Sequence, residues 1–360
     1  MTSPVHGSGG SHAAGTRTDD ATTTSSPSTG APVLEVDDLH VEFRSRGPVV
    51  NAVNGVSYSI APGETMAILG ESGCGKSVSA QAIMGILDVP PAHITGAIRF
   101  EGRDMLQMGA EEQRKIRGPG VSMIFQDALS ALNPVYSVGD QIGEMFRAHQ
   151  GASKKEAKDK AVELMDRVRI PAARQRVDDY PHQFSGGMRQ RVMIAMALAL
   201  DPKVLIADEP TTALDVTVQA QVMDLLKDLQ RDTGMGLILI THDLGVVNEV
   251  ADRVAVMYAG KVVETGTIDD VFTSPAHPYT RGLMSSIPVL DGKGQRLNPI
   301  VGAPPSLARI PAGCSFHPRC PMARRGDGGR PDCAGDVPPL REVAAGRRAA
   351  CHYSEELLHG

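Results

Sequence analysis

The residues best suited to chemistry in this chain form a glycine-rich segment, GESGCGKS, from Gly70 to Ser77. It follows a short apolar run, TMAIL, and precedes an apolar stretch that is typical of a helix. Glycines let backbone N–H groups close around phosphate oxygens, and the helix N-terminus adds partial positive charge. Lys76 would supply a full charge to the β- and γ-phosphates, and the Ser77 hydroxyl would bind Mg²⁺. The segment therefore predicts a nucleoside triphosphate site, with Cys74 as a small filler and not a nucleophile. The residues that we expect to line it are Gly70, Glu71, Ser72, Gly73, Cys74, Gly75, Lys76, Ser77 and Val78.

Two further motifs suit the same chemistry. Asp208 and Glu209 end the apolar run VLIAD, at the edge where ligands of open α/β sheets collect. Asp208 would hold Mg²⁺ through water, and Glu209 would orient or deprotonate an attacking water. Between the phosphate segment and these acids, Ser185, Gly186 and Gly187 begin a predicted helix. A hydroxyl and close-approach N–H groups at a helix N-terminus form a second anion site, separate from the first.

With these motifs in this order, the chain resembles the ATPases of ABC transporters, whose signature is a Ser-Gly-Gly turn at a helix N-terminus. Met188 stands at the last signature position, where glutamine is common. The resemblance implies head-to-tail dimers, with each ATP between one phosphate loop and the other subunit's signature. It also implies that Phe43 stacks on adenine, Gln126 touches Mg²⁺ and the attacking water, Asp215 lies at the dimer interface, and His242 contacts the γ-phosphate. Simpler roles stay open: a core aromatic for Phe43, an exposed loop amide for Gln126 and a helix cap for Asp215.

Several stretches resemble one branch, the oligopeptide and dipeptide importers. They are residues 125–142, 180–198 and 277–288, and the terminal GCSFHPRCP, PPLREV and ACHY. This resemblance implies an ATP-hydrolysing subunit that drives peptide uptake from the cytoplasmic face of the membrane, as a peripheral protein. Its partners would be a second, related but different ATPase subunit, two membrane-spanning permeases and, indirectly, an extracytoplasmic peptide-binding protein. Nickel, glutathione or opine-like cargo stays an alternative.

Four of the five cysteines lie in the last fifth of the chain, without a C-x-x-C pair. They are Cys314, Cys320, Cys333 and Cys351. The family resemblance implies a [4Fe–4S] cluster with a structural role, although the gap between the second and third cysteine is wider here than is usual. Zn²⁺, a mixed ligand set with His317 and His352, and free or disulfide-linked thiols stay open as alternatives. A redox module with the ATPase as its scaffold is a further alternative.

The elements that must position these motifs follow from periodicity. Residues 65–70, 203–208 and 236–241 are continuous apolar runs typical of buried parallel strands, and 216–232 is an amphipathic helix. Residues 34–43 and 49–60 alternate like strands, so the fold class is α/β. The resemblance adds a RecA-like core, an antiparallel β subdomain and an α-helical subdomain.

The predicted organisation is a disordered tail over 1–31, a nucleotide-binding domain over 32–275 and a small extension over 276–360. The helical subdomain would span about 130–200. A capping box of Ser153 and Glu156 predicts one of its helix starts.

Composition excludes other classes of protein. The formal net charge is −6, aromatic residues make up 4% and tryptophan is absent, so a basic or aromatic nucleic-acid platform is not expected. An ABC ATPase that acts on DNA or ribosomes would also carry a coiled-coil insertion or a second ATPase module, and the sequence shows neither. The longest apolar run, Val192 to Leu200, is far shorter than a membrane span.

Overall fold

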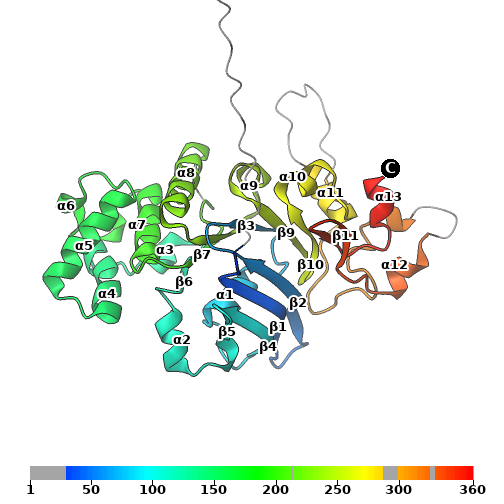
Figure 1. Cartoon of the computed structure of the whole chain (residues 1–360), viewed down its shortest axis with the longest axis horizontal. Coiled ribbons are helices and arrows are strands. Elements are labelled where there is room, and N and C mark those ends of the chain that lie inside the picture. Colours follow the sequence, from blue (N-terminus) through cyan, green and yellow to red (C-terminus); the bar gives the residue numbers. More distant parts are fainter. Residues whose placement is uncertain (1–29, 213, 287–298, 325–328, 360) are drawn as a thin grey trace, which may run out of the picture.

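The structure is a computed structural model that describes residues 30–212, 214–286, 299–324 and 329–359. These residues form two sheets with helices packed around them (Figure 1). All but two residues of the predicted disordered tail lie outside the described part. None of the helices in the described ranges combines the length and apolarity that a membrane span needs.

A small antiparallel sheet has the strand order β2-β1-β4-β5. Its strands are β1 (Leu34–Phe43), β2 (Val50–Ile60), β4 (Ala92–Phe100) and β5 (Arg103–Asp104). Several apolar residues of β1 and β2 are buried, among them Val36, Val41 and Val56. This is the antiparallel β subdomain that the family resemblance implied.

The central sheet has the order β11-β12-β10-β9-β3-β8-β7-β6. Five neighbouring strands run parallel: β9 (Arg253–Tyr258), β3 (Thr65–Leu69), β8 (Gly236–Ile240), β7 (Val204–Asp208) and β6 (Val121–Ile124). Every residue of β3, β6, β7 and β8 is buried, which explains their uninterrupted apolar sequences. Because the strands are parallel, the segments that follow them meet at one edge of the sheet.

Helix α1 (Lys76–Met84) lies between the two sheets and contacts strands of both. Residues on most sides of it are buried, so it lacks the polar face of a surface helix. The short elements η1 (Met105–Gln107) and α2 (Ala110–Ile116) follow the small sheet. Two helices flank β8 in sequence: α8 (Val216–Thr233), the predicted amphipathic helix, precedes it, and α9 (Leu244–Val250) follows it.

A group of helices occupies the stretch where a helical subdomain was predicted. They are α3 (Ala128–Ala131), α4 (Val138–Gln150), α5 (Lys154–Arg167), α6 (Ala173–Arg176), η2 (Pro181–Gln183) and α7 (Gly186–Leu198). The predicted capping box is present at the start of α5, where Ser153 and Glu156 each accept from the other's backbone N–H. In Figure 1 α4, α5 and α6 lie at one end of the long axis, and α12 and α13 lie at the other.

The C-terminal extension joins the central sheet directly, since β12 pairs with β10 and β11 pairs with β12. The strand that receives it is β10 (Lys261–Thr267), which α10 (Ile268–Thr273) follows. The elements of the extension are α11 (Pro278–Met284), η3 (Met322–Arg324), α12 (Pro331–Gly335), β11 (Arg341–Ala344), β12 (Arg347–Ala349) and α13 (Ser354–Leu358). The predicted boundary at residue 275 therefore falls within one continuous sheet, and the division into domains stays a prediction.

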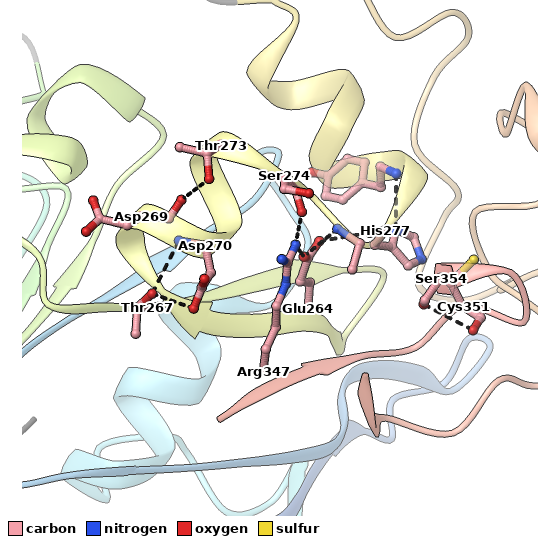
Figure 2. A network of polar contacts seen from close by, with 12 residues as sticks. Glu264, Thr267, Asp269, Asp270, Thr273, Ser274, His277, Arg347, Cys351 and Ser354 are labelled. Atoms are coloured by element: carbon pink, nitrogen blue, oxygen red, sulfur yellow. Dashed lines mark hydrogen bonds and ion pairs between the residues drawn. The ribbon is translucent and has the colours of Figure 1, made fainter. Parts of the chain in front are cut away.

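A buried ion pair fastens the extension to β10 (Figure 2). Arg347 donates to Glu264 at 2.9 Å and also to the carbonyl oxygen of Ser274. The Glu264 carboxylate accepts in addition from the backbone N–H groups of Ala276 and His277. A carboxylate with no exposed surface is tolerated only when its oxygens have hydrogen-bond partners. This network therefore specifies where the extension docks.

His277 caps the N-terminus of α11, where its Nδ1 accepts from the backbone N–H of Tyr279. Burial lowers the pKa of His277 to about 3, so the ring is neutral in the folded protein. Between that value and the ordinary pKa of about 6.5, the unfolded chain binds one more proton than the folded chain. Folding stability therefore falls as the pH drops through this window, by up to about 1.4 kcal/mol per pH unit.

We expect His277→Asn, which keeps a capping acceptor, to remove this part of the pH dependence. Urea unfolding at pH 7 and pH 5 measures it, with the exposed His93→Asn as the matched control. The difference in the free energy of unfolding between pH 7 and pH 5 should be smaller for His277→Asn than for the parent. For His93→Asn this difference should equal that of the parent. An equal pH dependence in all three proteins would contradict the assignment.

Candidate active site

The glycine-rich segment is pressed between two strands. Gly75 precedes α1 with a φ of 107°, and a Cβ there would lie 2.2 Å from the carbonyl oxygen of Ala52 in β2. A Cβ on Gly70 would lie 2.3 Å from the carbonyl oxygen of Met257 in β9. Around Gly73, by contrast, the Cβ position meets no atom within 4 Å. Glycine is therefore required at both anchors of the loop, while its tip is open to a ligand.

Lys76 is buried, and its ammonium lies inside the turn of this loop. The Nζ atom donates to the carbonyl oxygens of Gly70 at 2.8 Å and Glu71 at 3.1 Å. These partners are neutral, so the charge is not cancelled by them and stays available to an anion. The N-terminus of α1 lies directly beside it and adds its partial positive charge.

Ser77 and Asp208 form an oxygen pair at the end of β7. The Ser77 hydroxyl donates to Asp208 Oδ1 at 3.0 Å, and Asp208 is only 3% exposed. Burial raises the pKa of Asp208, and the hydrogen bond from Ser77 opposes this. Mg²⁺ prefers hard oxygen ligands, and a buried carboxylate beside a hydroxyl supplies them. Ser77 and Asp208 therefore fit the predicted ion.

Glu209 is the centre of the polar cluster. Its backbone has a φ of 46°, which is unfavourable for a residue with a Cβ, and its N–H donates to the carbonyl oxygen of Ile240. Glu209 Oε2 accepts from Gln126 Nε2 and Thr212 Oγ1, each at 2.9 Å. His242 Nδ1 lies 3.5 Å from Oε1. The three predicted catalytic residues thus meet from the ends of β7, β6 and β8.

Thr212 was missed from the sequence. It lies three residues after Glu209 in the turn that leaves β7, and this spacing is the only sequence signal for the contact. Gln126 donates to Glu209, and its predicted part in binding Mg²⁺ stays a prediction.

The Ser-Gly-Gly segment lies at the surface. Ser185 caps α7, and its hydroxyl accepts from the N–H of Met188 at 3.4 Å. Ser185 and Gly186 are exposed, whereas Gly187 and Met188 are half-buried. Asp215 is exposed and caps α8, with its carboxylate accepting from the N–H of Val218. Ser185 and Gly186 are therefore accessible to a neighbour, and both the second anion site and the interface roles of these residues stay predictions.

Other residues predicted to bind nucleotide contact protein. Phe43, at the end of β1, and Val78 pack half-buried against the core between the sheets. Cys74 is buried there too, and burial raises the pKa of its thiol, as suits a filler. Ser72 is exposed. The carboxylate of Glu71 is held by Arg319 of the C-terminal extension, a contact that sequence reasoning did not find.

The prediction of a four-cysteine metal site is not supported. Among the described residues, no group of three or more His, Cys, Asp or Glu side chains is arranged to hold a metal ion. All five cysteines are free, and burial raises the pKa of Cys314 to about 11 and that of Cys351 to about 12. The described residues therefore give no support to the predicted [4Fe–4S] cluster or to its Zn²⁺ alternative.

Comparison with known proteins agrees with this geometry. Residues 53–212 match the family model described as ABC transporter, and residues 263–326 match the oligopeptide/dipeptide transporter C-terminal region. The chain is 56% identical over 290 residues to the dipeptide transport ATP-binding protein DppD of Bacillus subtilis (strain 168), which covers 80% of this chain and 87% of that protein. It is 50% identical over 321 residues to a putative peptide import ATP-binding protein of Brucella abortus (strain 2308), covering 89% of this chain and 95% of that protein.

The fold has solved relatives as well. The ATP-binding cassette MJ0796, solved as a dimer in a post-hydrolysis state bound to ADP and Pi, superposes with a TM-score of 0.59 at 26% identity. The match covers 65% of this chain and 98% of that one. The chain therefore belongs to the ABC transporter family, as an ATP-hydrolysing subunit of the oligopeptide and dipeptide importers.

Proposed function

We propose that this subunit binds ATP on the 70–78 segment and hydrolyses it with Glu209, in a pocket that the Ser185 segment of a second subunit completes. One observation carries the proposal. Lys76, Asp208 and Glu209 converge at one edge of the central sheet, while a second N-terminal anion site, at Ser185, lies exposed on another helix. A single triphosphate needs only the first set, so the second set serves a neighbouring molecule.

The binding step uses the loop and α1. Lys76 and the first N–H groups of α1 neutralise the β- and γ-phosphates. Ser77 and Asp208 would hold Mg²⁺, which supplies charge neutralisation on the phosphate oxygens when it is bound. The open tip at Gly73 leaves room for the phosphates to enter the loop.

The hydrolysis step uses Glu209. Gln126 and Thr212 both donate to Oε2, which fixes the orientation of the carboxylate. Oε1 is left as the oxygen that accepts a proton from the attacking water, with His242 beside it. The strained backbone at Glu209 is a feature that functional sites retain because it aims a side chain.

The partner surface lies next to Gln126. Phe125, Val135 and Tyr136 are large apolar side chains with substantial exposure. Beside them a groove of about 490 Å³ is lined by apolar residues that include Met84, Met145, Met193 and Met196. We infer that a permease segment docks here, so that movement around Gln126 is passed to the channel.

We infer that the subunit would lie on the cytoplasmic face of the membrane, bound to two permeases and paired with a related but different ATPase subunit. Peptides would reach the channel from an extracytoplasmic binding protein that this chain does not touch. Opening and closing of the ATPase pair is then a two-state change driven by the difference in ATP affinity of the two states.

Glu209→Gln should leave ATP binding intact and lower the hydrolysis rate at least about 100-fold, because the amide cannot accept the water's proton. ATP turnover and ATP retention by the purified transporter complex measure the two effects, and the closed, ATP-bound pair should accumulate. Glu249→Gln on the exposed side of α9 is the matched control and should behave like the parent. Hydrolysis at the parental rate would remove Glu209 from the mechanism.

Lys76→Ala should weaken ATP binding itself by about 10-fold or more, since a charge-assisted contact is lost. Calorimetric titration of the purified subunit with ATP and Mg²⁺ gives the Kd. Lys227→Ala, which removes an exposed lysine on α8, should leave the Kd unchanged. Equal affinities for both variants and the parent would refute the assigned phosphate site.

Ser185→Ala should lower ATP hydrolysis in the assembled pair while leaving ATP binding to the isolated subunit unchanged. Ser153→Ala is the control, because it also removes a helix cap at a cost of about 0.5–2 kcal/mol, but at α5. Hydrolysis should fall only for Ser185→Ala. If the two variants hydrolyse ATP equally, Ser185 acts as a structural cap alone.

A further inference from the structure

The C-terminal extension contacts the phosphate loop at Glu71. Arg319 donates to both carboxylate oxygens of Glu71, from Nη1 at 2.6 Å and from Nη2 at 2.9 Å. The backbone N–H of Glu71 donates to the hydroxyl oxygen of Tyr279 at 2.9 Å. Its carbonyl oxygen accepts from Lys76 at 3.1 Å. All the polar groups of Glu71 thus have hydrogen-bond partners within the protein, and the partner of its backbone N–H is Tyr279.

The two residues that hold Glu71 are themselves fixed by a buried aromatic cluster. The rings of Tyr258, Tyr279 and Phe316 pack with centroid distances of 4.6, 5.3 and 5.4 Å, and each residue is at most 1% exposed. The Arg319 guanidinium lies over the rings of Tyr258 and Phe316 and donates to the Tyr258 hydroxyl at 3.3 Å. Tyr258 ends β9 of the central sheet, so the cluster joins the extension to the sheet beside the loop.

Because Glu71 carries a negative charge, its pairing with Arg319 affects the binding of a nucleotide. Its side chain is 25% exposed, in a loop that must receive a highly negative triphosphate. An unpaired carboxylate there would repel the phosphates, since like charges near a protein surface are screened less than in bulk water. Arg319, 6% exposed, pairs with it in bidentate geometry, and this hydrogen bonding is the main cause that raises the pKa of the guanidinium.

We propose that Arg319 and Tyr279 are positioning residues of the ATP site: they neutralise and orient Glu71, so that the C-terminal extension sets the affinity of the phosphate loop for ATP. The proposal rests on the ATP site described above. It gives a function to residues 277–282 (HPYTRG) and 316–321 (FHPRCP), which have no part in the proposed hydrolysis mechanism.

The decisive experiment measures ATP affinity in the full-length subunit by calorimetry with ATP and Mg²⁺. Arg319→Gln should raise the Kd about tenfold, because the Glu71 carboxylate is left unpaired beside the triphosphate. Adding Glu71→Gln to it should restore the Kd to within about threefold of the parent, because the repelling charge is gone. In steady-state hydrolysis the KM for ATP should follow the Kd, while kcat at saturating ATP stays within about twofold.

The matched control is Arg330→Gln. Arg330 lies in the same extension, pairs with Glu356 and stacks over Tyr353, with no described contact to the phosphate loop. Its Kd for ATP should equal that of the parent. A parental Kd for Arg319→Gln overturns the proposal, and so does a loss that Glu71→Gln fails to relieve, since a merely structural pair would give no relief.

A second variant tests the backbone contact independently and decides the matter if Arg319→Gln does not fold. Tyr279→Phe keeps the buried ring and removes the hydroxyl that accepts from Glu71, so the Kd for ATP should rise about threefold or more. Tyr353→Phe, which removes a hydroxyl bonded to Asp332 within the extension, should leave it unchanged. An unchanged Kd for Tyr279→Phe contradicts the proposal.

The ATP-binding measurements distinguish a failure of this proposal from a failure of the proposed ATP site. If Lys76→Ala binds ATP like the parent, the site itself is wrong. If Lys76→Ala loses ATP while the Arg319 and Tyr279 variants do not, only the role of the extension is wrong.

Discussion

The constraint on which the rest of this molecule depends is the common edge of the parallel strands β3, β8, β7 and β6. Buried on both faces, these strands cannot slide past one another without exposing apolar side chains or breaking their ladder. Their carboxyl ends are therefore held at one level. Lys76, Asp208, Glu209, Gln126 and His242 follow those ends, so the sheet fixes their spacing before any ligand is present.

Two local features of the backbone further fix the positions of these residues. The loop at Gly75 is held so near to β2 that no Cβ fits, and Glu209 retains a left-handed backbone that a hydrogen bond to Ile240 supports. Both features cost conformational energy, which the buried sheet can sustain. Both features lie at the edge of the sheet where the proposed catalytic residues meet.

The C-terminal extension is built into the ATPase and is not merely appended to it. The buried Glu264–Arg347 pair attaches its strands to β10, and the aromatic cluster around Tyr258 brings Tyr279 and Arg319 to the phosphate loop. In this chain the loop that we propose to bind the nucleotide also carries the contacts of the extension. Nucleotide binding and the packing of the extension are therefore linked thermodynamically, since each affects the position of Glu71.

The sequence by itself determined the strands, the phosphate loop, the paired acids and the capped helices, because these depend on local periodicity and on short motifs such as Ser153 with Glu156. Only the tertiary structure decided which distant side chains meet. Nothing in the spacing shows that Arg319 pairs with Glu71 across 248 positions or that Thr212 supports Glu209. Such contacts depend on sheet order and on burial, which are properties of the whole fold and not of neighbouring residues.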